Sequence, residues 1–170
     1  MELDALLRAL EATSIATAVR ENEVLFPWIE SFHVLAITLV VGSIAIVDLR
    51  LLGLASLDRA LNRLTAEVLP CVWSAFAVAV ISGGLLFSSN AHAYAHNSYF
   101  QAKFAFMALS GINMVFFHLV VGRDIERWGA ASQTTPLRAR IAGAGSLLFW
   151  FGVVACGRWV GFDLMPTPAA

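Results

Sequence analysis

The sequence predicts an all-α fold, in which a bundle of four transmembrane helices follows an amphipathic helix at the membrane surface. Of the 170 residues, 59% are hydrophobic and 14% are charged, against roughly half and a quarter in an average soluble domain. The sequence contains four uncharged runs, and each is close to the length of a membrane span, which takes about 20 residues. The composition excludes a water-soluble domain with a single core. The net charge of −1 excludes a chain built to wrap nucleic acid.

Residues 1–25 are expected to form the amphipathic helix, and residues 26–170 the transmembrane domain. Leucines recur at helical spacing among charged residues, as in a helix that lies on a surface. The leucines are Leu3, Leu6, Leu7 and Leu10, and the charged residues are Glu2, Asp4, Arg8 and Glu11. A cleavable signal peptide is not expected, because the acidic N-terminus has no basic region before its apolar part.

The four apolar runs cover residues 31–47, 68–87, 104–122 and 141–157. Flanking apolar and aromatic residues extend them, so helices are expected at about 27–53, 66–88, 98–124 and 136–160. Pro27 and Pro136 suit first-turn positions, and Asn97 or Ser98 suits the cap of the third helix. The runs are too long and too uniformly apolar for the alternating strands of a membrane barrel.

Basic residues set the expected orientation. Four spans put both termini and the loop around His92 on one side, and the loops at 54–67 and 123–140 on the other. The second side carries seven cations: Arg50, Arg59, Arg63, Arg123, Arg127, Arg138 and Arg140. The first side carries four, namely Arg8, Arg20, Lys103 and Arg158. The positive-inside bias then places the termini in the periplasm of a bacterium, with the chain in the cytoplasmic membrane.

A weak internal repeat at an offset of 76 residues suggests two helical hairpins related by an approximate two-fold axis. The sequence aligns Asp48, Gly53, Ala55 and Ser56 with Asp124, Gly129, Ala131 and Ser132.

The outer half of the predicted bundle gathers residues suited to a haem. Polar side chains inside a span are costly and are therefore candidates for function. The imidazole of His33 can hold haem iron, Gly83, Gly84 and Gly157 let a flat ring approach the backbone, and Lys103 and Arg158 can pair with propionates. His92 or His96 is a candidate second axial ligand. The alternative is a structural role, in which His33 bonds across helices, the glycines allow close packing and the cations reach for the interface.

Two other histidine patterns occur in the sequence. His92 and His96 stand four residues apart, a spacing that suits copper or zinc on one helical face, although a solvated loop without a metal is the simpler interpretation. Glu30 and His33 form one Glu-x-x-His pair, whereas a di-iron bundle needs two such pairs and further glutamates.

The inner half offers a second candidate site made of His118, Asp48 and Arg50, where a second cofactor or a quinone headgroup could lie. His33 and His118 fall about 18 Å apart along the membrane normal, so they cannot both ligate one haem. A surface role at the helix ends is the alternative for these residues. Cys71 and Cys156 lack CxxC spacing and indicate neither a zinc ribbon nor c-type haem attachment. No phosphate loop, nucleophile elbow or catalytic triad is present, and whether the protein is an enzyme stays open.

Residues 27–35, Val41–Gly42–Ser43 and 48–53 resemble the first helix of a family of small bacterial four-helix inner-membrane proteins of unknown function. Residues 100–103 and the stretch from Gly111 to His118 are similar to its third helix. More distantly, the chain resembles small membrane protoporphyrinogen oxidases that carry haem b, and copper-resistance membrane proteins of the D type. That resemblance implies His33 as a haem ligand and Lys103 as its functional partner.

The leading expectation is a b-type cytochrome-like membrane protein that binds haem b and transfers electrons on the periplasmic side. Its expected partners are the lipid bilayer and another membrane or periplasmic redox protein, or a second copy of itself. One alternative is a cofactor-free accessory or assembly subunit of a larger membrane complex. Another is a copper or zinc transporter or sensor that uses His33, His92 and His96.

Overall fold

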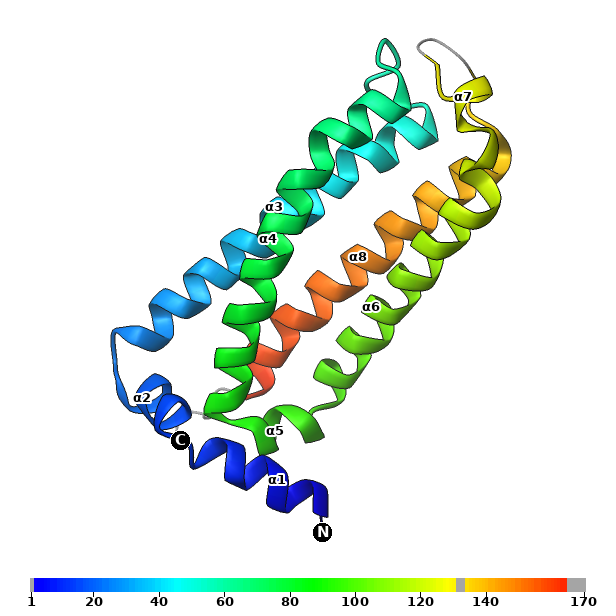
Figure 1. The fold of residues 1–170 in the computed structure, drawn as a ribbon. Helices are drawn as coiled ribbons and strands as arrows, with labels where there is room; N and C mark the ends of the chain where they lie inside the picture. Colours follow the sequence, from blue (N-terminus) through cyan, green and yellow to red (C-terminus); the bar gives the residue numbers. More distant parts are fainter. Residues whose placement is uncertain (1, 131–133, 165–170) are drawn as a thin grey trace.

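The computed structural model describes residues 2–130 and 134–164, and within these residues every regular element is a helix (Figure 1). The all-α prediction is therefore confirmed. The helices are α1 (Glu2–Glu11), α2 (Ser14–Glu21), α3 (Leu25–Leu52), α4 (Leu61–Ser89), α5 (Ala91–His96), α6 (Ser98–Phe116), the π-helix η1 (Phe117–Val121), the 3₁₀ helix η2 (Gly122–Asp124), α7 (Ile125–Trp128) and α8 (Leu137–Asp163).

Four helices are long and apolar enough to cross a bilayer: α3, α4, α8, and α6 with its continuation to Trp128. They run for 27 to 31 residues, or about 40 Å at 1.5 Å per residue, against a hydrocarbon core of about 30 Å. Many large apolar side chains on these helices are exposed, among them Phe32, Ile81, Ile112 and Phe151. A bilayer would cover this surface, and the chain is a multi-pass membrane protein.

The transmembrane helices form two hairpins. Helix α3 packs along α4, α6 packs along α8, and contacts between α3 and α8 join the two pairs. Glu2 and Asp163, the ends of the first and last helices, lie at the same end of the bundle, opposite α7. We call the end that carries α1, α2 and α5 the outer end, and the end that carries α7 the inner end.

The two hairpins do not match in detail at the residues of the internal repeat. Gly53 ends α3 in the left-handed conformation with φ of 78°, whereas Gly129 follows α7 with φ of −83°. Asp48 is buried, and Asp124 is exposed on η2.

The amphipathic N-terminal segment forms two helices and not one. Thr13 ends the first and caps the second, since its hydroxyl accepts a hydrogen bond from the amide of Ala16 at 3.3 Å. Both helices lie across the outer end of the bundle (Figure 1), where α1 packs on α5 and α2 packs on α4. Leu7, Ala16 and Val19 are buried in these contacts.

The segment expected as a loop around His92 contains the short helix α5. Asn97 separates it from α6 and caps α6 as predicted, because its side-chain oxygen accepts from the amide of Phe100 at 3.0 Å. The side-chain nitrogen Nδ2 of Asn97 donates to Oδ2 of Asp163 on α8 at 2.6 Å. Pro136 lies at the cap of α8, one residue before its first turn.

Candidate functional site

A cavity of about 490 Å³ opens in the outer half of the bundle between the four transmembrane helices and α5. Most of its lining is apolar, with Ile37, Val41, Leu86, Phe100 and Val153 among the walls. Its polar residues are Glu30, His33, Thr38, Tyr94, Lys103 and Arg158. The structure thus brings together five of the residues that the sequence assigned to a haem site: His33, Gly83, Lys103, Gly157 and Arg158. Gly84, His92 and His96 are not part of this lining.

His33 on α3 is held by a hydrogen bond that determines its tautomer. Its Nδ1 lies 3.0 Å from Oγ of Ser82 on α4. The hydroxyl of Ser82 donates its one proton to the carbonyl of Val78 at 2.6 Å, so it accepts from His33 Nδ1–H. The Nε2 atom of the neutral ring therefore keeps its lone pair, as a metal-ligating imidazole requires.

One glycine makes room for a side chain of the site. A Cβ added to Gly83 would lie 2.8 Å from Cε1 of His33, which is too close, whereas one added to Gly157 would lie 3.8 Å from Nζ of Lys103, an ordinary contact distance. Gly83 was expected to admit a flat ring, and its missing side chain allows the ring of His33 to lie against α4. Gly84 has no other atom within 4 Å of such a Cβ.

The two cations come from the two helices of one hairpin, α6 and α8. Lys103 lies one turn and a half into α6 and is half-buried. Arg158 lies near the end of α8, and its guanidinium stacks 4.7 Å from the ring centroid of Phe162. Two positive charges beside an apolar cavity suit a ligand with an apolar body and an anionic edge.

Several lining residues could not be recognised from the sequence. Tyr94 belongs to α5, which was expected to be a loop, and burial raises the pKa of its phenol, with the carboxylate of Glu30 raising it further. Gly42 and Gly161 also line the cavity, and a Cβ added to either would meet nothing within 4 Å. In the sequence each is one more glycine within an apolar helix, and a glycine there does not indicate which face of the helix it lies on.

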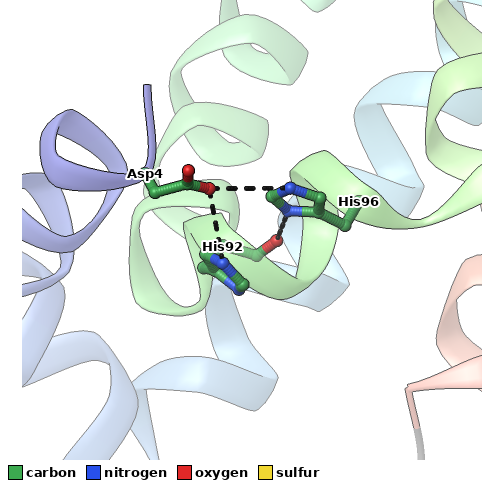
Figure 2. Close-up of side chains that lie close together, drawn as sticks. All are labelled: Asp4, His92 and His96. Carbon is green, nitrogen blue, oxygen red and sulfur yellow. Dashed lines mark hydrogen bonds and ion pairs between the residues drawn. The ribbon is translucent and has the colours of Figure 1, made fainter. Parts of the chain in front are cut away.

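His92 and His96 turn away from the cavity toward α1. Figure 2 shows the carboxylate of Asp4 between the two imidazoles, with Oδ1 of Asp4 at 3.6 Å from Nε2 of each ring. The structure therefore does not place either histidine where it could serve as a second ligand in the cavity.

Arg50, part of the second candidate site, is 1% exposed at the inner end. Its Nε donates to the carbonyl of Arg59 at 3.1 Å, and its two terminal nitrogens donate to the carbonyl of Ala130 at 3.1 Å and to the hydroxyl of Thr135 at 3.4 Å. These partners lie in the segments that follow α3 and α7. Arg50 thus ties the two inner connections together.

The other two members of the second candidate site lie in different surroundings. Asp48 is 5% exposed, and its Oδ2 has no hydrogen-bond partner. His118 is exposed on the π-helix η1, and its Nδ1 lies 2.8 Å from the carbonyl of Met114. Within the described ranges 2–130 and 134–164, no hydrogen bond or ion pair joins Asp48, Arg50 and His118 to one another.

Fold and cavity together define a four-span membrane protein with a largely apolar internal site that holds a histidine and two cations. The chain belongs to a family of unknown function, DUF6644, whose model matches residues 21–163. Comparisons with curated proteins and with solved structures found no match.

Proposed function

We propose that this protein binds haem b in the outer cavity through His33 and transfers electrons at that side of the membrane. The observation that carries the proposal is the hydrogen bond between His33 and Ser82, which leaves Nε2 as a free ligand atom inside a mainly apolar cavity. A bound haem iron would supply one-electron redox chemistry. The chain's own residues would bind the group, orient it and exclude water.

The dimensions and lining of the cavity support this ligand. A volume of about 490 Å³ lies within the range of roughly 300–1,000 Å³ found for cofactor sites. Gly42 and Gly161 border open space and leave room for a flat ring. Lys103 and Arg158 are the groups that would pair with the two propionates, and their charges would offset those of the carboxylates.

His33 is the one protein ligand to iron in this proposal. The expectation of a second ligand from His92 or His96 is set aside, because both imidazoles face Asp4 on α1. With His33 as the one protein ligand, a bound haem would be able to take up a further small ligand, so the reduced protein should bind carbon monoxide.

The proposed location is the cytoplasmic membrane of a bacterium, with the cavity on the periplasmic side. The inner end carries Arg50, Arg59, Arg63, Arg123, Arg127, Arg138 and Arg140, and arginines concentrate on the cytoplasmic side of membrane proteins. The cavity lies at the opposite end. A periplasmic or membrane redox protein, or a second copy of this chain, would then exchange electrons there.

The test is the absorption spectrum of the full chain, produced with ample haem supply and purified in mild detergent. We expect a Soret band, one haem per chain, and a shift of that band when carbon monoxide is added after reduction. His33→Gln should abolish haem binding, and the matched variant His118→Gln, which changes an exposed histidine at the inner end, should retain it.

A second pair of variants tests the position of the ligand. Gly42→Leu places a side chain in the cavity and should prevent haem uptake, whereas Gly84→Leu lies outside the cavity lining and should not. Protein that contains no haem under these conditions refutes the proposal. Stoichiometric co-purification of other membrane subunits with haem-free protein would instead support an accessory or assembly role.

A further inference from the structure

We infer that Asp4, His92 and His96 form a binding site for a divalent transition-metal ion, with zinc as the representative ion. The site lies at the outer end between α1 and α5 (Figure 2), and its three residues are not among those that line the cavity of His33. It offers one carboxylate oxygen and two imidazole nitrogens, and these three ligand atoms all lie within 4.8 Å of one another. This set suits zinc and copper better than calcium or magnesium, which prefer oxygen ligands alone.

The distances are close to those that a bound ion requires. A tetrahedral zinc ion with ligands at about 2.0–2.1 Å holds the ligand atoms about 3.4 Å apart. Oδ1 of Asp4 lies 3.6 Å from Nε2 of His92 and 3.6 Å from Nε2 of His96. A movement of a few tenths of an ångström would complete this part of the coordination shell. Three protein ligands leave the fourth position for water.

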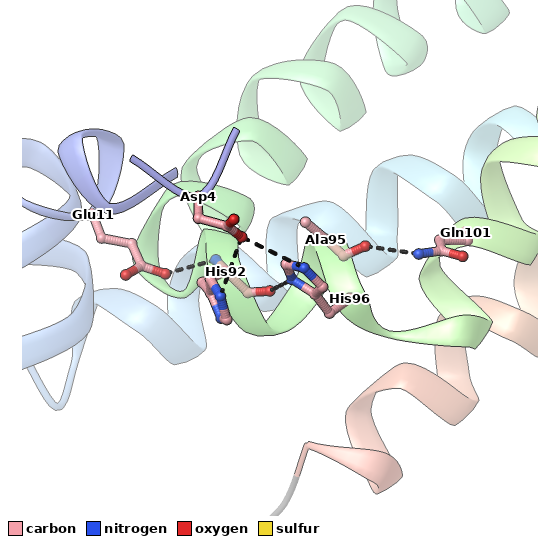
Figure 3. A network of polar contacts seen from close by, with 6 residues as sticks. All are labelled: Asp4, Glu11, His92, Ala95, His96 and Gln101. Carbon is pink, nitrogen blue, oxygen red and sulfur yellow. Dashed lines mark hydrogen bonds and ion pairs between the residues drawn. The ribbon is translucent and has the colours of Figure 1, made fainter. Parts of the chain in front are cut away.

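Hydrogen bonds around the cluster orient its ligands (Figure 3). Nδ1 of His96 lies 2.9 Å from the backbone carbonyl of His92. A carbonyl only accepts, so Nδ1 carries the proton and Nε2 is free to ligate. The amide of His92 donates to the carboxylate of Glu11 at 2.7 Å, which holds the far end of α1 on α5. Gln101 donates to the carbonyl of Ala95 at 3.0 Å and joins α5 to α6.

Solvent can reach the site, since the three side chains are between 38% and 55% exposed. A bound ion would join α1 to α5 across a long stretch of sequence and fix α5 in place. Because Tyr94 on α5 lines the cavity, the ion would also hold that part of the cavity wall.

The experiment measures zinc binding to the metal-stripped full chain in detergent, carried on a purification tag without histidine and kept free of haem. Competition with a chromogenic chelator gives the stoichiometry and the affinity. We expect one zinc ion per chain, with affinity reduced more than about tenfold in Asp4→Asn, His92→Gln and His96→Gln. The matched controls are Glu2→Gln, an exposed carboxylate on the same helix, and His118→Gln, an exposed histidine at the inner end.

Cobalt substitution provides a second readout, because tetrahedral Co²⁺ has visible absorption bands that disappear when a ligand is removed. The inference is wrong if the chain binds less than one zinc ion, or if Asp4→Asn binds zinc as tightly as the unchanged protein. It is also wrong if the two controls lose as much affinity as the ligand variants, since that result describes nonspecific surface binding.

Discussion

Arg50→Met is expected to destabilise the folded protein by about 3–6 kcal/mol, because it removes the hydrogen bonds of a buried charged donor. Arg50 is 1% exposed and donates to two backbone carbonyls at 3.1 Å and to one hydroxyl at 3.4 Å. A hydrogen bond from a charged donor contributes about 1.5–3 kcal/mol, so the two short bonds account for the range and the long one adds little. Methionine nearly preserves the volume, which keeps any cavity contribution small.

The measurement is equilibrium unfolding of the purified protein in mixed micelles, followed by tryptophan fluorescence. Trp128, one of five tryptophans, packs against the inner core of Leu51, Leu61, Val121 and Ala139, so part of the signal comes from this end of the bundle. Arg63→Met is the matched control, since Arg63 is exposed at the same end and its loss removes the same charge. We expect the control to change the free energy of unfolding by less than about 0.5 kcal/mol. Equal losses in the two variants would refute the structural role assigned to Arg50.

Two further predictions concern the outer end. Asn97→Ala should cost about 2–4 kcal/mol in thermal or denaturant unfolding, because it removes a helix cap and a hydrogen bond to the carboxylate of Asp163; a loss below 1 kcal/mol would contradict this. Burial, and then the charge of Glu30, raises the pKa of Tyr94. Stability should therefore be unaffected below about pH 10 and should fall as the pH rises from there through the folded pKa. In a Tyr99→Phe variant, which leaves Tyr94 as the one tyrosine, phenolate absorbance should appear at higher pH in folded than in unfolded protein.

The architecture was predictable because it depends on quantities that a sequence displays directly. The length of an apolar run measured against the bilayer identifies a span, and the residues at its ends identify its caps, as Asn97 does for α6. The short helix α5 was missed, since six residues without an apolar stripe give no periodic signal. The division of the first segment at Thr13 depends on one side-chain bond, although a threonine before a new helical turn is a recognisable cap.

The sequence predicted the depth of His33, Lys103 and Arg158, which line one cavity, but it gave no basis for deriving the direction in which each side chain points. Depth follows from the position of His33, Lys103 and Arg158 along their spans. Direction depends on how each helix is rotated about its axis, and these helices are apolar on nearly every side, so no polar stripe indicates the rotation. For this reason Gly83 was assigned to a ligand, whereas its missing side chain accommodates the ring of His33.

The cluster of Asp4, His92 and His96 shows why contacts between residues far apart in the chain could not be predicted from the sequence. His92 and His96 were recognised as a pair, and a solvated loop without a metal was the simpler interpretation because the chain has no cysteine, methionine or carboxylate close to them. Asp4 supplies that carboxylate through the packing of α1 on α5, which in turn depends on buried Leu7. Asp4 and Glu11 lie three residues before and four residues after Leu7, on the same face of α1, so the packing of this face on α5 also brings Asp4 to the histidines.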